Sequence, residues 1–134
     1  MPAVRRPLAR PPAERGSAVV DFVLVLLVIT PLFLGILQVA LVLMVRNTLA
    51  SAASEGARYA ATLDRGPEDG VARTRQQVDR AIAGRFARDV EADTVLVDGA
   101  PAVRVTVHAT VPALGIGGPG VSLTVTGHAI EEQP

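Results

Sequence analysis

The sequence predicts an α+β protein that one long N-terminal helix anchors in a membrane. Three observations predict this class. Residues 22–45 form an apolar run without a charged side chain, residues 67–90 carry apolar side chains at helical spacing, and the C-terminal part alternates apolar and polar residues as half-buried strands do. A chain of 134 residues has room for a membrane helix and one small domain, but not for two independent cores.

Charge is distributed unevenly along the chain, although the formal net charge is zero. Up to Gly16, four arginines stand against one glutamate. Asp21 is the only charged residue from Ser17 to Val45, and acids slightly outnumber arginines from Arg46 onward. This distribution is typical of a protein oriented in a membrane and not of one that binds nucleic acid. The absence of cysteine excludes disulfides and thiolate chemistry.

The apolar run Phe22–Val45 reads FVLVLLVITPLFLGILQVALVLMV. As a helix it spans about 36 Å, which exceeds a hydrocarbon core of about 30 Å. The positive-inside tendency keeps the arginine-rich start in the cytoplasm and places the C-terminal part across the membrane. We therefore expect a basic leader at residues 1–16, a transmembrane helix at 17–45 and an extracytoplasmic domain at 46–134, in a single-pass protein of the inner (cytoplasmic) membrane.

The start of the helix is predicted at about Ser17. The prolines of the leader exclude a helix there, and the Ser17 hydroxyl is a typical helix cap. Asp21 then lies in or just after the first turns, where a negative charge interacts favourably with the helix dipole. Pro31, inside the run, predicts a kink or one opened backbone hydrogen bond.

The alanine-rich segment 47–63 is predicted to continue the same helix. Its small residues form a narrow face suited to close approach by another helix or a sheet; they are Ala50, Ala53, Ala57, Ala60 and Ala61. Asp64 to Pro67 ends this helix. A second, amphipathic helix is predicted from Pro67 to Val90, with one apolar stripe made of Val71, Val78, Ile82 and Phe86.

A small antiparallel sheet of three strands is predicted for the remainder. The strands cover Thr94–Val97, Ala102–Val111 and 121–126; Asp98–Gly99 forms the first turn and the glycine-rich residues 112–120 the second connection. One face of the sheet packs on the helices, and the other, the wet face, is exposed to solvent. Pairing about a centre near residue 116 places His108 opposite Thr124, and His128 opposite Arg104.

The sequence predicts no catalytic, metal or cofactor site. The predicted register separates the two histidines, and the glycine-rich connection lacks the lysine of a phosphate-binding loop. We therefore expect a protein that is not an enzyme and that has no small-molecule substrate, no cofactor and no nucleic-acid partner.

Asp21 has two interpretations. It marks the membrane boundary, where a charge reaches the interface at little cost. Alternatively, a cut after Gly16 makes Ser17 a new N-terminus with an α-ammonium group. In a bundle of staggered parallel subunits, each Asp21 carboxylate then meets a neighbour's amine, which relieves the cost of burying either charge. Glycine before the cut lets a membrane protease approach the backbone closely.

The segments RGSAVVDF (residues 15–22) and ASEGARYAA (residues 53–61), with the apolar run between them, resemble the TadE-like proteins of bacterial tight-adherence (Flp) pilus systems. The resemblance covers about residues 15–61. It implies a pilin-like fold and a minor pilin or pseudopilin that a prepilin peptidase cuts and that assembles with other pilin or pseudopilin subunits and the pilus machinery. It assigns cleavage to Gly16 and Ser17, intersubunit contacts to Asp21 and Phe22, and a family motif to Glu55, Gly56, Ala57 and Arg58.

The sequence departs from the family pattern at three positions. Asp21 stands where the family usually has glutamate, Pro31 lies a few positions late, and Gln38 stands where relatives often carry an acid. In the family motif, a local pair between Glu55 and Arg58, three residues apart on a helix, is the expectation.

Two alternatives to this function stay open. One is an uncleaved single-pass protein whose outer domain binds or scaffolds a partner. The other is a secreted domain that signal peptidase releases near Ala52, where small residues precede a possible cut.

Overall fold

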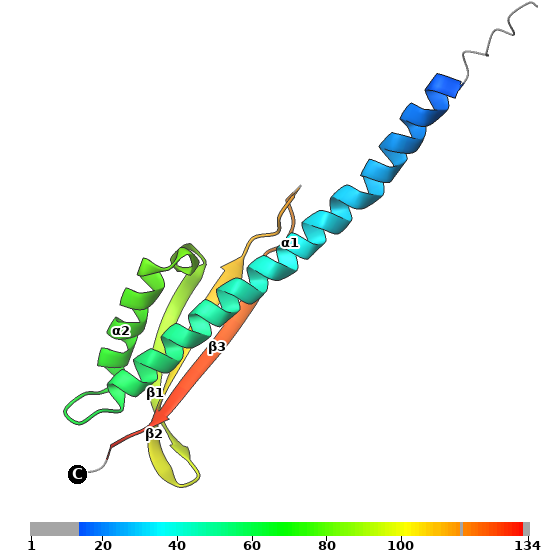
Figure 1. Cartoon of the computed structure of the whole chain (residues 1–134). Coiled ribbons are helices and arrows are strands. Elements are labelled where there is room, and N and C mark those ends of the chain that lie inside the picture. The colour runs from blue at the N-terminus through cyan, green and yellow to red at the C-terminus, as the bar shows by residue number, and fades with distance from the viewer. Residues whose placement is uncertain (1–13, 116, 133–134) are drawn as a thin grey trace, which may run out of the picture. The chain divides into compact units, whose positions relative to one another are not determined.

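The computed structural model describes residues 14–115 and 117–132. It contains a long helix, a second helix, a short 3-10 turn and a three-stranded antiparallel sheet, which confirms the predicted α+β class (Figure 1). The chain divides into two compact units between Gly35 and Ile36. The predicted leader lies almost entirely outside the described residues.

Helix α1 spans Glu14–Ala60. Helix already includes Glu14, so Ser17 lies inside α1 and the predicted cap at Ser17 is wrong. Pro31 does not end the helix, which continues on both sides of it. The alanine-rich segment continues α1 as predicted, but only to Ala60, three residues short of the predicted Leu63. The turn that follows includes Asp64 with a positive φ of 65°.

Helix α2 spans Pro67–Arg80, so the prediction that it reaches Val90 is wrong. The chain becomes extended at Ala81 and then forms the 3-10 turn η1, Ile82–Arg85. This turn folds tightly onto the end of α2, because a Cβ on Gly84 would lie 2.7 Å from the Val78 carbonyl oxygen. Of the predicted stripe, Val78 and Phe86 are buried, Val71 is half-buried, and the Ile82 side chain lies outside the description.

The sheet has the order β1-β2-β3, with strands at Ala87–Val97, Ala100–Val111 and Val121–Ile130. The first and third strands are longer than predicted. The predicted turn is confirmed: Asp98 and Gly99 both have positive φ, and they join the paired residues Val97 and Ala100, as in the tight hairpins whose twist matches the strands.

The predicted register of β2 and β3 is confirmed. His108 pairs with Thr124, and Arg104 pairs with His128. One face of the sheet packs on the helices within the second unit (Figure 1). The core of that unit joins valines of β2 to α1 residues, and its fully buried side chains include Leu49, Val103, Val105, Val107 and Val111.

The last described residues run beside the C-terminal end of α1. The Glu132 N–H donates a hydrogen bond to the Ala61 carbonyl at 2.8 Å, and the Glu131 N–H donates to the Pro101 carbonyl at 2.9 Å. These bonds attach the end of the chain to the part of the domain that holds the α1–α2 connection.

Candidate assembly surfaces

The N-terminal turns of α1 carry the predicted cleavage and assembly residues. Gly16, Ser17, Asp21 and Phe22 are all exposed, and a Cβ on Gly16 would meet no atom within 4 Å. Ser17 and Asp21 are four residues apart in one helix and therefore lie on the same face, one turn apart.

Large apolar side chains follow along the same helix. They are exposed, and they include Leu24, Leu27, Val28, Ile29, Leu32 and Phe33. An apolar surface of this extent on a single helix requires lipid or another protein to cover it.

The Glu-Gly-Ala-Arg motif lies farther along α1, where this helix contacts α2. Gly56 is buried, and a Cβ there would clash with the Thr74 side chain and lie 2.8 Å from the Gly70 carbonyl oxygen. A Cβ on Gly70 would in turn lie 2.9 Å from the Ala60 Cβ and 3.1 Å from the Gly56 carbonyl oxygen. The two glycines therefore allow the two helices to approach at backbone distance.

Polar contacts join the two helices around this glycine pair. Thr74 is fully buried, and its hydroxyl donates to the Ala52 carbonyl at 3.4 Å. The Glu55 carboxylate pairs with the Arg73 guanidinium at 3.3 Å. Among the described ion pairs, Glu55 has its partner in α2 and not at Arg58, so the predicted local pair is wrong.

Arginines also stack on the aromatic ring that follows the motif. The Arg65 guanidinium lies 3.8 Å from the centroid of the Tyr59 ring, and that of Arg73 lies 5.6 Å from it, within the range of a cation–π contact. Tyr59 thus joins α1 to the α1–α2 connection and to α2.

The predicted face of small residues on α1 is confirmed. Ala53, Ala57, Ala60 and Ala61 are buried, and Ala50 is half-buried. On the sheet side, a Cβ on Gly127 of β3 would lie 2.6 Å from the Ala53 carbonyl carbon. The motif therefore packs α1 on α2 through Gly56 and lies in the core through Ala57.

Gln38 has a role that sequence reasoning missed. Its side-chain amide donates to the Pro112 carbonyl at 3.3 Å and accepts from the Leu114 N–H at 2.7 Å. Both partners belong to the β2–β3 connection. The signal was present in the sequence: a lone amide in an apolar run requires hydrogen-bond partners.

The wet face of the sheet carries an ion pair and a histidine contact. Arg104 donates two hydrogen bonds to the Asp93 carboxylate, and His108 Nδ1 lies 3.2 Å from the Thr124 hydroxyl. The hydrogen bonds from Arg104 lower the pKa of Asp93, and those to Asp93 raise the pKa of Arg104. Within the described residues, no three acids or histidines lie close enough to hold a metal ion.

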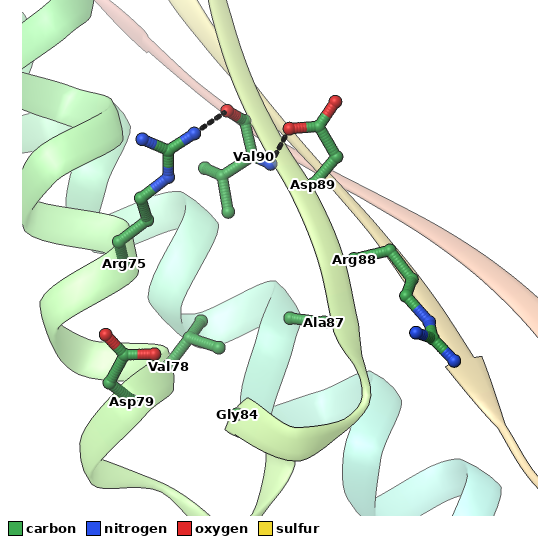
Figure 2. Close-up of a pocket in the computed structure, with 8 residues that line it drawn as sticks. All are labelled: Arg75, Val78, Asp79, Gly84, Ala87, Arg88, Asp89 and Val90. Atoms are coloured by element: carbon green, nitrogen blue, oxygen red, sulfur yellow. Dashed lines mark hydrogen bonds between the residues drawn. The ribbon is translucent and has the colours of Figure 1, made fainter.

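A small hollow of about 180 Å³ lies between α2 and β1 (Figure 2). The Arg75 guanidinium of α2 reaches across it and donates to the Val90 carbonyl of β1 at 3.4 Å. This contact joins α2 to β1. The start of β1 occupies the last residues of the second helix as it was predicted.

Helix α1 is the one helix in the described part of the chain that is long and apolar enough to cross a membrane, and none of its most apolar window is buried. This exposed apolar helix makes the chain a membrane-anchored protein.

Comparison with known families found a match to the model described as TadE-like protein, over residues 16–58. Comparison with curated proteins and with solved structures found no match. The family match begins at Gly16 and ends at Arg58, and it includes the apolar run and the Glu-Gly-Ala-Arg motif. Residues 16–58 of this membrane-anchored chain are therefore similar to TadE-like proteins, over the segment that carries the two sequence motifs.

Proposed function

We propose that this protein is a minor pilin or pseudopilin of a tight-adherence (Flp) pilus assembly or secretion system, and that a prepilin peptidase cuts it after Gly16. The TadE-like match supports a pilus-associated protein in general. The observation that carries the finer proposal is the position of Gly16, Ser17 and Asp21 at the exposed start of an apolar run that carries no other charge until Arg46.

The proposed assembly step uses two surfaces of α1. Before assembly, lipid covers the exposed apolar side chains. In a filament, neighbouring α1 helices take the place of lipid, and the Asp21 carboxylate pairs with the α-ammonium of a neighbour's Ser17. Phe22, which is 63% exposed, adds apolar contact area beside that charge pair.

The protein acts in this proposal as a structural subunit without catalytic activity. The Glu-Gly-Ala-Arg motif attaches α1 to α2 through the Gly56–Gly70 contact and the Glu55–Arg73 pair. The proposed partners are the peptidase, other pilin or pseudopilin subunits and the assembly machinery. The proposed orientation places the N-terminus in the cytoplasm and the domain outside.

N-terminal sequencing or intact-mass measurement of protein recovered from cells tests the cleavage. We expect a start at Ser17. The variant Gly16→Val should abolish processing because a branched side chain obstructs the peptidase, whereas Gly16→Ala should impair it less. Neither variant should alter the fold, because a Cβ on Gly16 meets no atom within 4 Å.

Two other results would contradict the proposal. An intact leader in cells that contain the peptidase would support the uncleaved anchor. The backbone from Glu14 to Ser17 is helical, and this favours the uncleaved anchor because cleavage requires the first turn of α1 to open. Helix ends fray readily, so the free-energy cost of opening this first turn is small. A start near Ala53 would support the secreted domain instead.

A further inference from the structure

We propose that the second compact unit, an α/β unit that begins at Ile36, binds an anionic phospholipid at the end where Gln38 lies. An acyl chain occupies an apolar groove, and the headgroup phosphate lies at Arg80. The inference rests on membrane anchoring by α1. It does not rest on cleavage or on pilus assembly.

The groove lies between α1 and the chain that follows α2, and its volume is about 270 Å³. Leu41, Met44 and Val45 of α1 form one wall. The opposite wall consists of Ala81, Ala83 and Phe86. Six of the eight lining residues are apolar, and the other two are Thr48 and Arg80, so most of the groove fits a hydrocarbon chain better than a polar ligand.

The groove occupies the end of the apolar run of α1. Met44 and Val45 are the last apolar residues, Arg46 ends the run, and Thr48 lines the groove one turn beyond Met44. A hydrocarbon core needs about 20 helical residues, and the run that begins at Phe22 is longer than that. Its last residues therefore lie where acyl chains give way to headgroups, so both parts of a phospholipid are within reach of the groove.

One arginine lines the groove, and three others lie nearby. Arg80 lines it directly, and Arg85 and Arg88 line the next hollow, beside Pro112. Arg46 is exposed on α1 at the same level. These arginines outnumber the nearby acids Asp79 and Asp89. Guanidinium groups bind phosphate through paired donors, and basic residues beside a bilayer are attracted to anionic lipids.

The opposite end of the same unit is acidic. The α1–α2 connection, the start of α2, the β1–β2 turn and the C-terminal residues carry Asp64, Glu68, Asp69, Asp98, Glu131 and Glu132, against Arg65 and, in the last turn of α1, Arg58. The unit therefore has a basic end beside the apolar run and an acidic end away from it. A negatively charged surface attracts the first and repels the second.

The β2–β3 connection completes the basic end with an uncharged surface. Residues 112–120 include no charged side chain, and Gln38 holds Pro112 and Leu114 beside the apolar run. Leu114 is 42% exposed. An exposed leucine in an uncharged loop at this level is suited to contact with the bilayer interface.

Native mass spectrometry of the full chain in detergent tests the inference. The protein is incubated with equal amounts of phosphatidylglycerol and phosphatidylcholine, and the retained lipid is counted. We expect preferential retention of phosphatidylglycerol. Arg80→Gln should reduce that preference about fivefold, and Arg80→Gln with Arg85→Gln should reduce it further. Arg58→Gln is the matched control, because Arg58 is exposed on α1 away from the groove.

A second pair of variants tests the groove without a change of charge. Met44→Trp fills it and should reduce retention of both lipids. Leu43→Trp, at an exposed neighbouring position that does not line the groove, should not. Equal retention of the two lipids by the unaltered protein, an unchanged preference in the Arg80 variants, or equal behaviour of the two tryptophan variants would overturn the proposal. Dimers in place of lipid adducts would also overturn it, because they would assign the groove to a second copy.

Discussion

Helix α1 carries two surfaces that differ in side-chain size more than in polarity. From Val19 to Phe33 its exposed side chains are mostly large, chiefly valine and leucine. From Ala52 to Ala60 its buried side chains are alanine and glycine. A large side chain is tolerated where a fluid lipid or a movable neighbour covers the helix. Where a second helix and a sheet lie at fixed backbone distance, only small side chains fit.

The comparison teaches that apolar residues along one helix do not all indicate a core. The large residues from Val19 to Phe33 form a surface that lipid or another protein covers, whereas the small residues from Ala52 to Ala60 lie where α2 and the sheet pack on the helix. Substitutions of the same kind in the two parts should therefore have different effects.

The largest expected effect concerns assembly through the first part of α1. In the proposed assembly, Asp21→Ala should abolish pilus formation while leaving the outer domain folded, because it removes the carboxylate proposed to pair with a neighbour's α-ammonium. Asp21→Glu should assemble, since it keeps the charge with a longer reach. Electron microscopy counts the filaments, and mass measurement confirms processing. Normal filaments from processed Asp21→Ala would leave Asp21 as a marker of the membrane boundary only.

The second effect compares two glycines of α1. Gly56→Ala should destabilise the domain by about 1–3 kcal/mol, because its Cβ overlaps Thr74 and closely approaches Gly70. Gly35→Ala should cause no loss, since its Cβ meets no atom within 4 Å and alanine is the better helix former. Urea unfolding in detergent measures both. If both variants lost the same stability, the close contact at Gly56 would not be the cause of the loss.

A smaller effect concerns the connection that Gln38 holds. Gln38→Met removes both hydrogen bonds to the β2–β3 connection, at a cost of about 1 kcal/mol, and should speed exchange of the Leu114 amide. Gln38→Glu keeps an acceptor for that amide and should preserve more of its protection. Hydrogen exchange detects the difference. Equal protection of Leu114 in the unaltered protein and in both variants would show that Gln38 does not hold the connection.

The smallest effect depends on pH and belongs to the wet face. Arg104 lowers the pKa of Asp93 below its ordinary 3.8. The pairing of the two side chains therefore stabilises the fold fully at pH values above 3.8. The stabilisation is lost as the pH falls through the lower folded-state pKa. Asp93→Asn should remove this part of the acid dependence of thermal unfolding. Glu91→Gln is the control for loss of a carboxylate from the same strand, and an identical acid dependence in both variants would exclude the pair as its cause.

The elements with a regular pattern were predictable from the sequence. The alternation of β2 and β3 determined which faces they bury, and symmetry about the glycine-rich connection determined their register, including His108 opposite Thr124. The length and composition of the apolar run predicted most of α1. In each case the information is local, because a period of two or an uninterrupted apolar run needs no knowledge of distant parts of the chain.

The rest depended on contacts between distant residues. Val78 and Phe86 are both buried, as a continuous helical stripe predicts, yet the chain between them turns back at Gly84 instead of remaining helical. Glu55 pairs with Arg73 only because α1 and α2 pack closely through two glycines. Gln38 finds its partners in a connection more than seventy residues away. No pattern within one segment contains these pairings.

The attachment of the C-terminal residues has a practical consequence for labelling. Glu132 is hydrogen-bonded beside Ala61, and about 35 Å of helix separates Ala61 from Gln38. A fluorescent or enzymatic reporter fused directly behind Glu132 would therefore begin at the acidic end, far from Gln38 and from the groove between α1 and the chain that follows α2. Such a fusion would report the compartment of the domain directly and leave the N-terminal surface of α1 unobstructed.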